Sequence, residues 1–195
     1  MCKYICLAAF LFLSACSFAE AQVKYRVYLG TYTGEKSKGI YQCELNLKDG
    51  SLSTATLAVE TNSPSFVAFH PTGKYLYAVN EAQAKVSAFA INKRSGRLTF
   101  LNSQPSQGGA PCHLYIDPTG RNVLAANYSG GSCICIPIAA SGHLGKASSF
   151  QQHVGKKKNG HSIHVDQANR FALCCDLGLD KVIIYAFDAS HGTLT

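Results

Sequence analysis

Among the titratable side chains of the 195-residue sequence, we single out His161, His113 and Glu81 as candidates for proton transfer. Imidazole has an ordinary pKa of about 6.5, so a histidine can accept and return a proton near neutral pH. A carboxylate can do the same where its surroundings tune its pKa. We therefore take these three as candidates for a catalytic base or acid that activates water, against the alternative that each is structural. His70 and His164 are interpreted as structural, because they lie one residue before a predicted turn or inside a predicted alternating strand.

A second set of candidates could bind a substrate: Asn80, Asn127, Asp176 and Arg170. The first three end successive predicted strands, so they would lie at one end of those strands. The alternative for them is a bond to turn backbone, which Asn and Asp commonly make. Arg170 is a possible partner for an anionic group, as are Arg26 and Arg121.

Several common sites are missing from the sequence. Ser129-Gly130-Gly131-Ser132 joins two predicted strands, so it is not a phosphate-binding loop that opens a helix. No G-x-S-x-G elbow of a serine hydrolase occurs. The cysteine spacings Cys133-x-Cys135 and Cys174-Cys175 do not match zinc pairs. The sequence therefore predicts no metal and no cofactor, and it indicates that these cysteines are small buried residues, with one disulfide possible in an oxidising compartment.

A recurring unit of about 47 residues organises the chain. Pro71 and Pro118 are 47 residues apart, and Gly120 and Asn169 are 49 apart. The unit begins with a short apolar strand and a turn, and a weaker third copy covers 161–170. Second strands are predicted at 75–80, 122–127 and 171–176, third strands at 86–91, 133–138 and 182–187, and fourth strands from Leu98 and Leu194.

Four short strands in each 47-residue unit are typical of a β-propeller blade. Sustained helical periodicity is lacking, and a β-sandwich would not require the unit to recur three times in one order. The sequence thus predicts an all-β propeller of four-stranded antiparallel blades over residues 25–195, with about 3.5 blades present.

The phase of the repeat indicates a partial ring. Residues 27–33 align with a second strand, with Tyr28 opposite Ala78, then 39–45 with a third strand, and Leu52 begins a fourth. We expect the first blade to lack its innermost strand and the last to lack its outermost. A ring left open exposes blade faces and sheet edges, so we expect the chain to be a fragment that needs a C-terminal half for closure.

The motifs of this repeat resemble the 6-phosphogluconolactonase family of seven-bladed propellers, also known for 3-carboxymuconate cyclases. The resemblance rests on these stretches: 28–33 with 39–41, 64–81, 109–114, 126–132, and 170–182. It implies hydrolysis of 6-phospho-D-glucono-1,5-lactone, a small-molecule sugar lactone, to 6-phosphogluconate in carbohydrate metabolism. The alternatives are a non-enzymatic binding or scaffold propeller and a muconate-type enzyme acting on a non-phosphorylated substrate.

One segment departs from the family pattern. The family carries a Pro-His-Ala-His-Ser type of motif after a longer loop, whereas this chain has Asn159-Gly160-His161-Ser162 after a lysine run. His161 stands at the second histidine position and Asn159 at the first. The resemblance thus assigns any retained catalytic role here to His161.

The N-terminus predicts export. Residues 1–21 carry Lys3 and a nine-residue apolar run, as in a signal peptide, and Leu13–Cys16 has the form of a lipobox that would attach a lipid at Cys16. We expect a periplasmic or extracellular protein, tethered to a membrane at most through this lipid. The net charge of +7 is spread thinly and without interleaved aromatic residues, which argues against nucleic acid.

Overall fold

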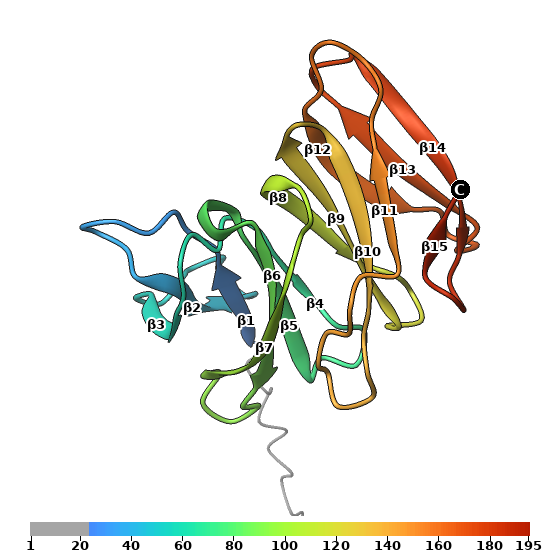
Figure 1. The fold of residues 1–195 in the computed structure, drawn as a ribbon. Helices are drawn as coiled ribbons and strands as arrows, with labels where there is room; N and C mark the ends of the chain where they lie inside the picture. Colours follow the sequence, from blue (N-terminus) through green and yellow to red (C-terminus); the bar gives the residue numbers. More distant parts are fainter. Residues whose placement is uncertain (1–23) are drawn as a thin grey trace, which may run out of the picture.

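The computed structural model describes residues 24–195, which form four antiparallel sheets that follow one another in chain order (Figure 1). The first sheet has three strands and each of the others has four. The strands are β1 (Lys24–Leu29), β2 (Gly39–Asn46) and β3 (Thr56–Glu60); β4 (Val67–Phe69), β5 (Tyr75–Asn80), β6 (Lys85–Ile91) and β7 (Leu98–Pro105); β8 (Gly109–Ile116), β9 (Asn122–Ser129), β10 (Ser132–Pro137) and β11 (Ser149–Gln152); and β12 (Gly160–Val165), β13 (Phe171–Asp176), β14 (Lys181–Asp188) and β15 (Thr193–Leu194). Each strand pairs within its own unit, which confirms the predicted blades.

Three hydrophobic cores lie between neighbouring blades. Strand alternation divides each blade into two apolar faces. On β10, Ile134 and Ile136 pack against the second blade, while Cys133 and Cys135 pack against the fourth. A third cluster joins the first and second blades. The two cysteines therefore share a face, as predicted, and both are buried.

Strands β4, β8 and β12 are the first strands of their blades, each at a sheet edge. We call the end where they begin the N-terminal face, and the end where they finish the C-terminal face. Because β5, β9 and β13 run antiparallel to them, these second strands end at the N-terminal face. The turn η1 (Glu81–Gln83) lies there as well.

One turn position recurs with the same backbone conformation in all three repeats. Gly73, Gly120 and Asn169 have φ of 65°, 72° and 58°. This left-handed region suits glycine, and Asn is among the few other residues that tolerate it. The aligned residues of the sequence repeat therefore form the same turn, including the weaker third copy.

The alignment of Tyr28 with Ala78 was wrong by one residue. The Tyr28 hydroxyl donates to the Gly96 carbonyl (2.6 Å), and the Tyr77 hydroxyl donates to the Gly142 carbonyl (3.0 Å). Each bond joins one blade to the corresponding turn of the next, so Tyr28 matches Tyr77. The loop between β1 and β2 is longer than the loop between β5 and β6, so the sequence alignment of β1 with β5 was one residue out of register.

Other boundaries also differ from the expectation. The first strand ends at Leu29 and not at residue 33. The fourth strand of the first blade begins at Thr56, because Leu52 forms only an isolated bridge with Leu45. The last blade does possess its outermost strand, the two-residue β15. Among residues 24–195 the first blade has three strands, β1, β2 and β3.

The predicted leader (1–21), its lipobox at Leu13–Cys16, and Cys2, Cys6 and Cys16 lie outside the described residues. Within residues 24–195 we find no helix with the length and apolar character needed to span a bilayer.

Candidate active site

His113 and His161 lie on neighbouring inner strands, β8 and β12. The Cys112 sulfur lies 3.5 Å from the Gly160 carbonyl oxygen and 3.4 Å from that of His161, so its single S–H donates to this pair and links the two strands at the N-terminal face. The side chain of His161 is exposed, with its ring 6.0 Å from that of Tyr128. His161 is thus accessible to a ligand, as a catalytic base must be.

His113 is enclosed by other rings. Its centroid lies 4.3 Å from that of Phe66 and 4.8 Å from that of His164. Its Nδ1 accepts the backbone N–H of Ile163 (3.3 Å). Burial, together with the nearby His164 and His161, lowers the pKa of His113 to about 4, so this ring is neutral at pH 7.

Glu81 opens the turn η1 at the same face. One carboxylate oxygen, Oε2, accepts hydrogen bonds from the hydroxyls of Tyr32 (2.9 Å) and Ser65 (2.7 Å). The bond to Glu81 raises the pKa of Tyr32, so this phenol keeps its proton. Residues of the first two blades therefore hold the carboxylate in place.

Cys112 lies between Glu81 and His161 but is unsuited to nucleophilic attack. Burial and the charge of Glu81 raise the pKa of its thiol to about 11. The reactive form of cysteine is the thiolate, which is scarce at neutral pH with such a pKa. Cys112 serves here to join β8 to β12.

Asn80 and Asn127 are buried at the N-terminal face. Asn80 donates from Nδ2 to the Asn62 carbonyl (2.6 Å) and to Thr61 Oγ1 (3.0 Å). Asn127 donates from Nδ2 to the Ser106 carbonyl and to Ser132 Oγ, both at 3.0 Å. Through these bonds each amide holds the chain segment that precedes the first strand of its blade. This is the structural role that was considered as the alternative for them.

Asp176 occupies the same position in the fourth blade, and its side chain is fully buried. Its Oδ1 accepts the backbone N–H groups of Asn159 (2.8 Å) and Leu179 (2.9 Å). Its Oδ2 pairs with Nδ1 of His153 at 2.5 Å. The carboxylate is therefore committed to interactions inside the protein.

Arg170 lies at the opposite end of the inner strand from His161. It follows the end of β12, whereas His161 is near its start, and six strand residues span about 16 Å. Its side chain is 70% exposed, with Nε 3.7 Å from Asp166 Oδ2. The structure thus groups His113, His161 and Glu81 but leaves Arg170 on the C-terminal face.

Three residues near His113 were not among the predicted site residues. His164, interpreted from the sequence as structural, is exposed on β12, and its ring lies 5.4 Å from that of Tyr115. Phe66 precedes β4 and contacts the His113 ring. A signal was available, since alternation places residues 113 and 115 on one face of β8.

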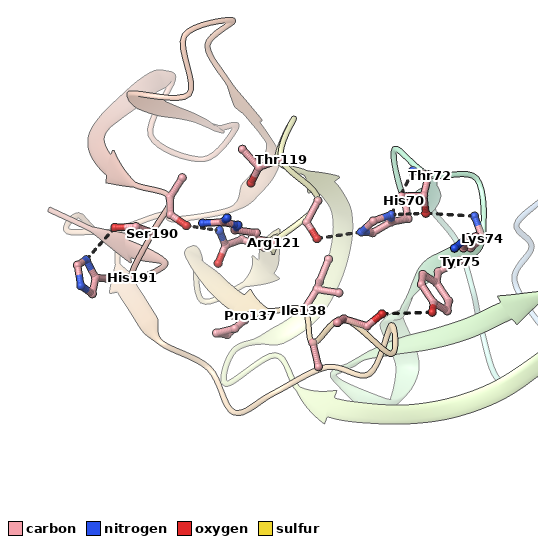
Figure 2. A pocket seen from close by; sticks show the side chains of 15 residues that line it. His70, Thr72, Lys74, Tyr75, Thr119, Arg121, Pro137, Ile138, Ser190 and His191 are labelled. Carbon is pink, nitrogen blue, oxygen red and sulfur yellow. Dashed lines mark hydrogen bonds between the residues drawn. The ribbon is translucent and has the colours of Figure 1, made fainter.

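Two hollows flank these elements. One of about 390 Å³ adjoins His161 and is lined also by Cys175, Asp180 and Lys181. Figure 2 shows the other, of about 550 Å³, whose lining includes Lys74 and Arg121 at the C-terminal face. The larger hollow lies away from the three catalytic candidates. We place the site at the N-terminal face, because accessible acid–base groups matter more for chemistry than hollow size.

Known proteins show the same fold. The family model described as "Lactonase, 7-bladed beta-propeller" matches residues 26–195. The 6-phosphogluconolactonase of Bacillus subtilis (strain 168) is 36% identical over 88% of this chain and 51% of its own length. A solved Bacteroides fragilis structure has TM-score 0.80 and 33% identity, covering 85% of this chain and 49% of that one. The solved structure of the periplasmic gluconolactonase of Pseudomonas aeruginosa has TM-score 0.77 and 25% identity. It covers 85% of this chain and 50% of that one.

The chain spans about half the length of the relatives that it matches. The match nevertheless covers nearly all of the described residues, and the blades reproduce the expected pairing. The chain therefore belongs to the lactonase family of seven-bladed β-propellers.

Proposed function

We propose that this chain forms part of a sugar-lactone hydrolase, with 6-phospho-D-glucono-1,5-lactone as the leading substrate and 6-phosphogluconate as the product. The observation that carries this proposal is that the exposed His161 and the neutral His113 lie on adjacent inner strands. Relatives from Bacillus subtilis and Formosa agariphila are named 6-phosphogluconolactonase, which supports the same reaction class.

In this mechanism His161 takes a proton from a water molecule as the water oxygen attacks the lactone carbonyl. The carbonyl electrons move to oxygen, and they return as the ring C–O bond breaks. The departing ring oxygen then receives a proton from His161 and becomes a hydroxyl, which restores the base. A general base of this kind typically increases the reaction rate by about 10²–10⁴-fold. His113, uncharged at neutral pH, packs beside the reacting groups without adding positive charge.

A direct assay of the mature protein tests this function. Purified protein is given gluconolactone and its 6-phosphate separately, and acid release is followed above the spontaneous rate. We expect catalysed opening of at least one lactone, with the phosphorylated one preferred. A rate no higher than the spontaneous rate with both would contradict the proposal.

The alternative substrate is a non-phosphorylated lactone, which export of the protein would favour. The predicted signal peptide supports a location outside the cytoplasm, and one structural neighbour is named a periplasmic gluconolactonase. Fractionation of the producing cells tests export, and a Cys16→Ala variant tests the lipid anchor. Release of that variant from the membrane fraction is expected if Cys16 is lipidated.

A binding or scaffold role is the second candidate. It is favoured by Asn159, which stands where the family resemblance expects a histidine, and whose Nδ2 donates to the Tyr128 carbonyl (3.1 Å). A scaffold would bind a sugar lactone or acid without accelerating its hydrolysis. Restoring histidine in Asn159→His separates the two roles, because only an enzyme should gain rate.

We also propose that closure of the ring requires further blades supplied by a C-terminal half. The faces that such blades would cover are apolar at both ends of the described chain. Tyr25 and Leu29 are 57% and 41% exposed on the first blade, and Val182 and Ile184 are 54% and 63% exposed on the fourth.

A further inference from the structure

Two cysteines and a histidine from three separate segments meet inside the interface between the third and fourth blades. Cys133 comes from β10, Cys174 from β13, and His153 from the segment after β11. All three residues are buried, and one donor atom of each lies within 4.8 Å of the other two. The ring of His153 lies against Gly160, the residue that precedes the candidate His161 on β12.

The histidine in this group has a ring nitrogen available. Asp176 Oδ2 lies 2.5 Å from Nδ1, and the other oxygen of Asp176 already accepts two backbone N–H groups. A carboxylate with these donors acts as an acceptor, so the Nδ1 proton is fixed toward Asp176. Nε2 is buried and has no hydrogen-bond partner among the described residues.

We propose that Cys133, Cys174 and His153 bind one Zn²⁺ ion, with Asp176 orienting the histidine. Thiolate sulfur and imidazole nitrogen are the ligands that zinc prefers, and a carboxylate bound to the far ring nitrogen is the usual support of such a histidine. Two thiolates balance the charge of the cation. A water molecule completes a four-coordinate site.

The spacing fits this ion after a small adjustment. Zinc–sulfur bonds of about 2.3 Å in a tetrahedron place two sulfurs about 3.8 Å apart. The two sulfurs lie within 4.8 Å of one another and therefore need to approach by about 1 Å at most. The ion would link β10 to β13 across the interface and so join two blades. This inference does not depend on the lactonase proposal.

The test uses the purified, reduced chain, stripped of metal with a chelator. We expect it to bind one equivalent of Co²⁺, giving a thiolate charge-transfer band and the visible bands of a tetrahedral ion, both displaced by Zn²⁺. Zn²⁺ in large excess over its Kd should raise Tm by about 5 °C or more. No band, or no displacement by Zn²⁺, would overturn the proposal.

Matched variants locate the ion. Cys133→Ser and Cys174→Ser should abolish the cobalt bands, whereas Cys135→Ser, on the same strand and face as Cys133, should keep them. Bands that survive in both of the first two variants would contradict the assignment, as would a Cys133–Cys174 disulfide in protein isolated from its host. If a variant fails to fold, the ligands are identified by alkylating the cysteines of the wild-type chain with and without Zn²⁺. Zn²⁺ must then slow modification of Cys133 and Cys174 more than that of Cys135.

Discussion

At the scale of single residues, His161 carries the sharpest prediction. Because its exposed ring is the accessible base in the proposed mechanism, His161→Ala should lower kcat/KM for the preferred lactone by about 10²-fold. Steady-state kinetics on the mature protein measure this change. A fall of less than about threefold would remove His161 from the mechanism.

The control for this variant is His143→Ala. His143 is also exposed, but it lies in the turn after β10 on the C-terminal face, where its Nδ1 is 3.1 Å from Ser141 Oγ. Its substitution should leave kcat/KM unchanged. An equal loss in both variants would indicate a general effect of losing a surface histidine.

His113 should make the fold sensitive to acid. Its folded-state pKa of about 4 lies below the ordinary value of about 6.5, so the unfolded chain binds more protons between these two values. This contribution to stability is present above about pH 6.5 and is lost as the pH falls toward 4. His113→Asn keeps an acceptor for the Ile163 N–H and removes the titration.

Denaturant unfolding at pH 7 and pH 5 measures this effect. We expect the variant to lose less free energy of unfolding between the two pH values than wild type does, by on the order of 1 kcal/mol because the ring is only partly buried. Equal losses would show that His113 titrates normally. Since both proteins share the other six histidines, the comparison isolates this one.

At the scale of elements, the turn after each inner strand depends on its first polar residue. Asp117 is buried and accepts the backbone N–H groups of Arg121 (2.8 Å) and Asn122 (2.7 Å). It also accepts Nδ2 of Asn169 (3.0 Å) from the next blade. In Asp117→Asn an NH₂ group replaces one carboxylate oxygen, so some of these buried N–H groups lose their acceptor. The free energy of unfolding should therefore fall by about 2 kcal/mol or more.

Asp166 provides the matched comparison in the fourth blade. Its Oδ1 accepts the N–H groups of Arg170 (2.6 Å) and Phe171 (2.7 Å), but it is partly exposed. Water can replace lost partners there, so Asp166→Asn should cost about 1 kcal/mol or less. Chemical denaturation of both variants tests this difference, and equal losses would refute the role assigned to burial.

Strand order and blade pairing were predictable because the repeat combines alternation with turn residues at fixed offsets. Gly73, Gly120 and Asn169 illustrate this, since one backbone conformation selects all three. The prediction failed where a loop has no counterpart in the other units. The longer loop after β1 caused Tyr28 to be aligned with the wrong residue of the next blade. Because β3 begins later than expected, Leu52 was wrongly assigned to the start of the fourth strand.

The candidate site was predictable only in part. Strand phase placed His113 and His161 on inner strands correctly. It did not reveal that Asp176 turns inward to His153, because that pair is 23 residues apart and depends on how the chain enters the fourth blade. For the same reason cysteine spacing gave no sign of the meeting of Cys133 with Cys174.

At the scale of the whole molecule, each blade is stabilised by apolar contact with the next. On β6, Val86 and Ala88 pack against the third blade, and on β10 Cys133 and Cys135 pack against the fourth. Strand register places Val182 and Ile184 at the same positions of β14. These two are more than half exposed, whereas their four counterparts are fully buried.

This exposed pair should drive self-association of the 195-residue chain studied alone. Burying apolar surface is favourable by about 25 cal/mol per Å², and exposed apolar patches promote association with other molecules. Sedimentation should show oligomers that dissociate when Val182 and Ile184 are both replaced by Lys. Val154→Lys is the control, because Val154 is 92% exposed outside this face and its replacement should leave the oligomers intact. A wild-type chain that stays monomeric at every concentration would show that the fourth blade does not need a neighbour on this face.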